Sequence, residues 1–209
     1  MTPRIPVADG DADTAEIAAY ERDRRALLRR GFALGGAAIA ASSVPLLLTA
    51  RDAFAKATGD AAILERAITL EQVAVVAYDT ALGGDLLSPP ALRSARRFRG
   101  HEQQHADTLK TALTDLGGVP PAPPTGLADV DKVVKGLGDV KTQAEVVNVL
   151  IELELATVAA YHDAQAKLIE ARLMQSFATI MANEGQHLVV LRTIVGAKPV
   201  PNAFETGTT

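Results

Sequence analysis

Two stretches decide the fold of this chain: Glu102-Gln103-Gln104-His105 and Glu184-Gly185-Gln186-His187. Both read Glu-x-x-His, a spacing that puts the carboxylate and the imidazole on one face of a helix. Both lie inside an apolar helical stripe, beside Phe98 in one case and Ile180 in the other. With eleven Glu and four His in 209 residues, less than one such match is expected by chance. The two pairs therefore require a chemical explanation.

Apolar residues recur at spacings of three and four along most of the chain after Gly59. The pattern predicts four helices, over about residues 60–83, 90–116, 142–167 and 170–195. Gly83-Gly84, Pro89-Pro90 and Gly117-Gly118 are the expected stop and start signals. The first and third helices also carry an acid within the apolar stripe, Glu71 and Glu154 respectively. Each predicted helix thus has an ionisable residue where a core residue is expected.

An internal repeat aligns these acids. Glu71 is followed by Tyr78, and Glu154 by Tyr161, each seven residues on, and the two halves are offset by 82 or 83 residues. In each helical hairpin the two acids lie 15 or 16 residues from the turn. At about 1.5 Å per residue, antiparallel partners at equal distances from their turn lie level. We expect six side chains to converge halfway along the bundle: Glu71, Glu102, His105, Glu154, Glu184 and His187.

The predicted fold class is all-α, a four-helix bundle of two hairpins joined by a long crossover at 118–141. The crossover begins with a run of prolines, and a short helix around Val130–Leu137 is expected within it. Residues 56–195 form the bundle, and 196–209 an irregular tail. The chain has no cysteine, which excludes thiol catalysis, disulfides and Cys-ligated metals. Its net charge of −4 provides no basic surface for nucleic acid.

Four buried carboxylates without partners would be expelled or neutralised, whereas two divalent cations would balance their charge. The six residues resemble the ligand pattern of the ferritin-like superfamily, the di-iron and di-manganese carboxylate proteins. The resemblance covers about residues 60–195 and implies a centre of two iron ions, with manganese as an alternative. It also implies that Glu102 and Glu184 bridge the metals and that Glu71 and Glu154 are terminal ligands. No haem is expected, because Gln103 stands where bacterioferritin has its haem-binding methionine.

Alternative interpretations exist for several of these residues. His101-Glu102-Gln103-Gln104-His105 also matches the His-Glu-x-x-His helix of zinc proteases, but the repeat has Asn183 in place of His101. His101 is therefore expected to be an exposed helix residue, as is His162. Glu152 rivals Glu154 as a ligand, and the repeat favours Glu154. Tyr78 and Tyr161 are either core residues or partners that orient the ligands or take part in redox chemistry.

Residues 1–55 resemble a twin-arginine secretion signal. Arg29-Arg30 precede an uncharged run of about 20 residues, and Ala53-Phe54-Ala55 has the form of a cleavage site. The alternative is an uncleaved membrane anchor. We expect export through the twin-arginine machinery to the periplasm, cell wall or outside of the cell. The ending Pro199-Val200-Pro201, together with the signal, resembles exported bacterial ferritin-like domain proteins, including desiccation-related ones.

The resemblance implies Fe(II) and oxygen or peroxide as reactants, with ferroxidase or peroxidase-type activity. Two other functions stay open at this point. One is a non-catalytic, metal-stabilised bundle in stress or desiccation protection, and the other is a dimanganese catalase. A homo-oligomer is also left open, and Arg93, Arg96, Arg97 and Arg99 are expected to form a solvated face or an oligomer contact.

Overall fold

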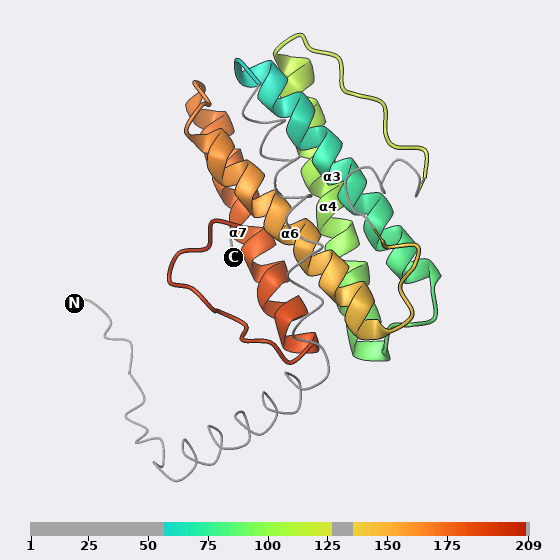
Figure 1. The fold of residues 1–209 in the computed structure, drawn as a ribbon. Coiled ribbons are helices and arrows are strands. Elements are labelled where there is room, and N and C mark those ends of the chain that lie inside the picture. The colour runs from blue at the N-terminus through green and yellow to red at the C-terminus, as the bar shows by residue number, and fades with distance from the viewer. Residues whose placement is uncertain (1–56, 127–135, 208–209) are drawn as a thin grey trace, which may run out of the picture. The chain divides into compact units, whose positions relative to one another are not determined.

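Four long helices dominate the computed structural model, which describes residues 57–126 and 136–207 (Figure 1). They are α3 (Asp60–Gly83), α4 (Pro89–Asp115), α6 (Gln143–Gln165) and α7 (Ala171–Ile194). Their ends differ from the predicted ends by at most two residues. No strand occurs in the described ranges. The prediction of an all-α four-helix bundle is confirmed.

The helices form two hairpins, α3 with α4 and α6 with α7, and the hairpins meet along α3/α6 and α4/α7. The connection that leaves α4 passes along the outside of α3 (Figure 1). The Gln72 side chain on α3 donates a hydrogen bond to the Pro121 carbonyl in this connection, at 3.4 Å. Asp60, at the start of α3, accepts hydrogen bonds from the backbone N–H groups of Ile169 and Glu170, both at 2.9 Å. The second hairpin turn is thereby fastened to the first helix.

Local sequence explains where the helices begin and end. Thr142 and Glu145 form a capping box at the start of α6, in which each side chain accepts from the other's backbone N–H. Pro89-Pro90 open α4, where a missing N–H costs nothing. After α4 the chain turns at Gly117, whose φ of 79° favours glycine. Gly118 N then donates to the Leu113 carbonyl at 2.9 Å.

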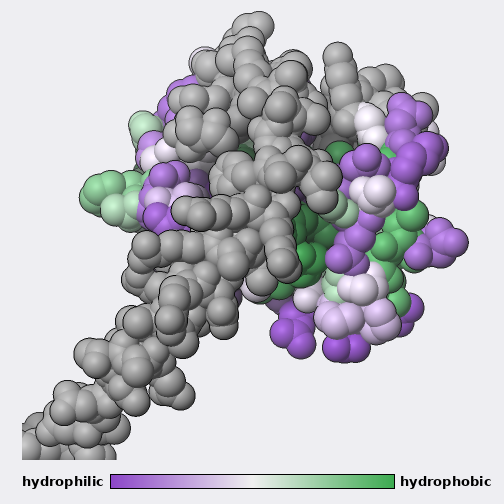
Figure 2. Space-filling view, turned by 60° about the horizontal axis from the view of Figure 1, so that its bottom comes forward, coloured by the Kyte–Doolittle hydropathy of each residue, from purple (hydrophilic) through white to green (hydrophobic). Residues whose placement is uncertain are grey.

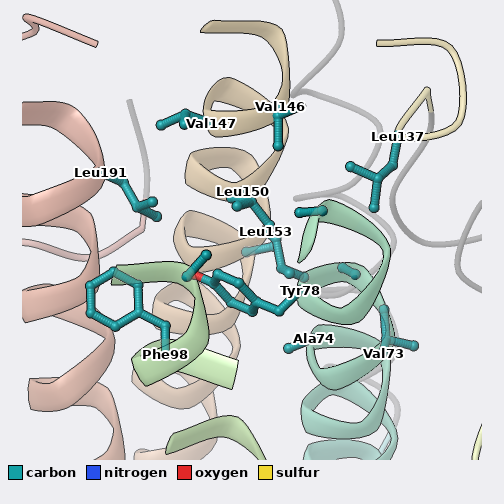
Figure 3. Close-up of a cluster of buried hydrophobic side chains, with 14 residues drawn as sticks. Val73, Ala74, Tyr78, Phe98, Leu137, Val146, Val147, Leu150, Leu153 and Leu191 are labelled. Carbon is teal, nitrogen blue, oxygen red and sulfur yellow. The ribbon is translucent and has the colours of Figure 1, made fainter. Parts of the chain in front are cut away.

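Two large apolar clusters fill most of the bundle, one towards each end, and a third, smaller cluster consists of Leu155, Val158 and Leu188. The first includes Tyr78, Phe98 and Leu150, and Figure 3 shows its side chains meeting between the helices. The second includes Ile68, Tyr161 and Phe177 among its members. In sequence, the acids of α3, α4 and α7 lie between the residues of the two clusters, and Glu154 on α6 lies near the end of the first cluster's residues. The core is therefore apolar at both ends and carries its ionisable groups in the middle.

Residues 196–207 form an irregular segment that runs beside α6 and α7 (Figure 1). The Arg192 guanidinium on α7 pairs with the Glu205 carboxylate at 2.8 Å. Gly207 has a φ of 69°, and a Cβ placed there would lie 2.2 Å from the Leu155 carbonyl oxygen. Only glycine fits this approach of the tail to α6. In the view of Figure 2, the outer parts of the described surface are mostly hydrophilic, and hydrophobic residues show towards the centre.

Some predictions fall on residues outside those described. They are the signal segment, 1–55, with its cleavage site, and most of the short helix expected around Val130–Leu137. Within 57–126 and 136–207, none of the helices is both long enough and apolar enough to cross a membrane.

Candidate metal centre

All six side chains that the sequence singled out meet in the middle of the bundle. Helix α3 contributes Glu71 and α6 contributes Glu154, while α4 and α7 each contribute one Glu-x-x-His pair. The four carboxylates and His187 are at most 2 % exposed, and the His105 side chain is 12 % exposed. The helix stripes account for this placement, since each residue lies in register with the apolar residues that face the core.

The six residues form two overlapping groups, in each of which the potential ligand atoms lie within 4.8 Å of one another. One group holds Glu71 and His105, the other holds Glu154 and His187, and both contain Glu102 and Glu184. His105 Nδ1 lies 3.0 Å from Glu184 Oε1 and 3.5 Å from oxygens of Glu71 and Glu102. His187 Nδ1 lies 2.9 Å from Glu184 Oε2, 3.1 Å from Glu102 Oε1 and 3.3 Å from Glu154 Oε1. Either group could hold a metal ion.

Most of these atoms lack a hydrogen-bond partner although they are buried. They are Glu71 Oε2, both carboxylate oxygens of Glu102 and of Glu184, and Nδ1 of His105 and His187. The short contacts between them do not have hydrogen-bond geometry. Buried polar atoms are nearly always satisfied, so a concentration of unsatisfied ones indicates a missing partner. Lone pairs that converge from several sides fit a cation.

The protonation states of the site also reflect its burial. Burial raises the pKa of Glu71 to about 8, and it raises the pKa of Glu184 well above its usual range, with further contributions from the charges of Glu102 and Glu154. Burial alone would raise the pKa of Glu102 too, but contacts with both histidines outweigh it and lower that pKa to about 2. The carboxylates likewise overcome the desolvation of His105 and His187 and raise both pKa values to about 12. Without metal, the site therefore holds protons in place of cations.

The two tyrosines bind carboxylates across the α3/α6 interface. Tyr78 donates its hydroxyl hydrogen bond to Glu154 Oε1, and Tyr161 donates to Glu71 Oε1. Each tyrosine thus donates its hydrogen bond to the acid of the other helix and not to the acid seven residues before it on its own helix. Both tyrosines are fully buried. The sequence left their role open, and the geometry favours the orientation of the ligands.

His101 is the residue that the sequence analysis missed. We expected it to be exposed, but it is half-buried, and its Nδ1 lies 2.9 Å from His187 Nε2. The His101 and His187 rings are stacked with centroids 5.2 Å apart, and Phe98 stacks on His187 at 4.0 Å. His187 turns its Nδ1 towards the carboxylates, so its Nε2 is free to contact His101. This contact fixes the orientation of the His187 ring. The sequence drew attention to His101 only through the His-Glu-x-x-His match, which does not indicate a contact with His187.

The remaining candidates lie outside both groups. Glu152 is buried but does not belong to either group, whereas Glu154 does, as the repeat indicated. His162 is exposed, as expected, and so are Glu65 and Glu145, of which Glu145 caps α6. His101 is also absent from both groups, which gives no support to the zinc-protease alternative. Among the arginines of α4, Arg99 pairs with Asp79 on α3 at 2.9 Å.

Comparison with known proteins agrees with this architecture. A search of curated proteins finds no match to the chain. The family model for the ferritin-like domain matches residues 59–197, which include all four helices and all six side chains of the centre. This match covers about two thirds of the 209 residues. The chain therefore belongs to the ferritin-like domain family.

Proposed function

We propose that this protein binds two iron ions and oxidises Fe(II), with oxygen or peroxide as the electron acceptor. The observation that carries the proposal is the overlap of the two groups of potential ligands, which share Glu102 and Glu184. A carboxylate has two oxygens, so a shared carboxylate can bind two cations at once. Glu71 and His105 would complete one position, and Glu154 and His187 the other.

The donor set suits iron or manganese. It consists of carboxylate oxygens and two imidazole nitrogens, and the chain has no cysteine that could favour copper or zinc. Two divalent cations would balance four carboxylates and occupy the space that the unsatisfied oxygens and Nδ1 atoms face. Iron is proposed over manganese because the family resemblance implies a di-iron centre, and metal analysis distinguishes the two.

When bound, two iron ions supply two electrons, one from each Fe(II). Peroxide that accepts these electrons and two protons loses its O–O bond and leaves as two water molecules, and oxygen that accepts them leaves as peroxide. The chain's own residues prepare the site. Glu102 and Glu184 hold both positions close together, and Tyr78 and Tyr161 orient Glu154 and Glu71 through their hydroxyls. The apolar clusters on either side keep bulk water away.

The test is metal analysis followed by turnover. The full-length protein is loaded anaerobically with Fe(II), the bound iron is counted, and Fe(III) formation is followed after peroxide or air is added. We expect two iron ions per chain and oxidation faster than in buffer. A Glu102→Gln, Glu184→Gln double variant should lose both properties, while the exposed Glu65→Gln variant should keep them. Wild-type protein that binds no iron, or oxidises it no faster than buffer, would refute the proposal.

A second candidate is a metal that only stabilises the fold. The observation in its favour is that the centre lies inside the core, where four carboxylates are at most 2 % exposed. Removal of Glu102 and Glu184 together as alanines would then lower the melting temperature, while the wild-type protein would show no turnover. A dimanganese catalase is distinguished by the manganese content of protein from the native host and by dismutation of peroxide.

Export through the twin-arginine pathway is the corresponding proposal for localisation. It rests on Arg29-Arg30, the uncharged run and Ala53-Phe54-Ala55. A mature protein that starts near Lys56 is the expected result of N-terminal sequencing after export. Full-length protein that starts at Met1 outside the cytoplasm would show that the signal is not cleaved and would favour the membrane-anchored alternative. Native mass of the same sample would determine whether the chain is a homo-oligomer.

A further inference from the structure

The two halves of the centre differ in their access to solvent. A depression of about 280 Å³ lies between α4 and α7, and its lining includes His105 itself. His105 is the one ligand candidate of the six with a side chain more than 2 % exposed, whereas His187 is 0 % exposed. The complete lining consists of Gln104, His105, Thr108, Ser176, Thr179 and Ile180. The His105 ring therefore borders the depression, while its Nδ1 faces the buried carboxylates.

The internal repeat shows what closes the opposite side. With an offset of 82 residues, Phe98 corresponds to Ile180 and His101 corresponds to Asn183. Phe98 lies on the His187 ring at 4.0 Å, and His101 lies against the same ring with Nδ1 2.9 Å from Nε2. Phe98 is larger than its counterpart Ile180, and His101 is larger than its counterpart Asn183, so these two side chains cover His187. The same fold therefore has an open half and a covered half.

The lining of the depression is neutral and rich in acceptor oxygens. The hydroxyls of Thr108, Ser176 and Thr179 donate their protons to helix carbonyls one turn back, at 2.8–3.1 Å. The Gln104 amide N–H also donates to a helix carbonyl, at 3.2 Å. The lone pairs of these oxygens remain available to a ligand in the depression, and they can replace water around a hydrated divalent cation. Apart from His105 the lining has no ionisable side chain. A cation would therefore pass through the depression without being bound tightly there.

We infer that this depression is the access route by which hydrated divalent cations reach the centre, and that it makes the two metal positions unequal. The cation at His105 exchanges with solvent. The cation at His187 arrives through the same route and leaves slowly, because Phe98 and His101 cover its other side. The inference rests on the proposed metal centre, but it does not depend on any oxidation of iron.

The test uses Co(II) alone, in full-length protein without an oxidant, so that binding is separated from redox chemistry. Stopped-flow absorbance follows uptake, and chelator addition follows release. For the wild-type protein we expect two cobalt ions per chain, of which one is released faster. Thr179→Arg, which places a positive charge at the exposed rim, should slow uptake roughly tenfold with the final stoichiometry unchanged. The Thr108→Val, Thr179→Val double variant, which removes two acceptor oxygens but keeps the shape, should also slow uptake.

Matched controls lie on the same helices but outside the lining. Thr193→Arg on α7 and Thr111→Val on α4 change exposed threonines whose hydroxyls also donate to helix carbonyls. Both should bind cobalt at the wild-type rate. Phe98→Leu, which uncovers His187, should speed release of the slow cobalt ion.

Uptake by Thr179→Arg and by the double valine variant at the wild-type rate would overturn the access route, even if the protein oxidises Fe(II). Release of both cobalt ions at one rate would overturn the inequality of the two positions. Slower uptake in these variants, in a protein that does not oxidise Fe(II), would support the access route and refute the proposed oxidation. Failure of the wild-type protein to bind cobalt would overturn both.

Discussion

Replacement of Tyr161 by phenylalanine tests the link between the phenol and the metal ligands most directly. The substitution removes one oxygen atom from a fully buried side chain and leaves the ring, which packs against Phe177 with centroids 4.8 Å apart. The lost group is the hydroxyl that donates to Glu71 Oε1. Since Glu71 is also fully buried, no water can replace the hydroxyl without a rearrangement of the core. The variant should fold and bind metal more weakly.

The size of the effect follows from the charge of Glu71 in the two states. With a pKa of about 8, Glu71 is mostly neutral at pH 7 when no metal is bound, and it is anionic when it binds a metal. A hydrogen bond to a charged group contributes about 1.5–3 kcal/mol, against about 0.5–1.5 kcal/mol for a neutral pair. The metal-bound state therefore loses about 1–1.5 kcal/mol more than the metal-free state. This difference corresponds to about a tenfold loss of metal affinity.

The measurement is a competitive Co(II) titration at pH 7, with thermal melting of the metal-free protein in parallel. Thr157→Val is the matched control, because it removes another buried hydroxyl from α6 that donates only to the Leu153 carbonyl, at 3.0 Å. The control should lower the melting temperature and leave the cobalt affinity unchanged. The reasoning is refuted if Tyr161→Phe binds both cobalt ions as tightly as the wild-type protein.

Three further outcomes are expected. First, the rise in melting temperature on Co(II) binding should be larger at pH 8 than at pH 5.5. In the metal-free fold the pKa of Glu71 is raised from 4.5 to about 8, and the pKa values of His105 and His187 are raised from 6.5 to about 12. The bound protons stabilise this fold at low pH, and the stability is lost as pH rises above 4.5 for Glu71 and above 6.5 for the histidines. The metal-bound fold holds none of these protons, so it does not lose stability in this way. Second, Glu154→Gln should reduce bound cobalt from two to one per chain in equilibrium dialysis, whereas Glu152→Gln should leave two, because Glu152 lies outside both ligand groups. Third, Gly207→Ala should make the tail sensitive to limited proteolysis, because its Cβ would lie 2.2 Å from a carbonyl oxygen of α6 and would push the tail away. Gly185→Ala, in the middle of α7 and with open space around its Cβ, should instead raise the free energy of unfolding by about 0.5–1 kcal/mol.

Local sequence patterns are enough to predict the helices, their order and the height of each acid. Apolar spacing and the glycine and proline signals defined the helix ends to within two residues, because these are local properties of the chain. The offset of 82 or 83 residues between halves identified Glu154 rather than Glu152, since only Glu154 has a counterpart in Glu71. The prediction that the four acids lie at the same height followed from the rise per residue of a helix and from the equal distances of the acids from their turns.

The contacts between side chains on different helices could not be predicted in this way, because they depend on how the helices pack. Tyr78 lies about 10 Å along the axis from Glu71 on its own helix, so it cannot bond that acid, and the antiparallel packing of α3 on α6 gives it Glu154 instead. The contact of His101 with His187 likewise depends on how α4 and α7 are rotated about their axes. A depression borders His105 while Phe98 covers His187, because two pseudo-equivalent halves carry side chains of different size. Periodicity fixes the face and height of a residue on its own helix, whereas its neighbours on another helix depend on the packing of both.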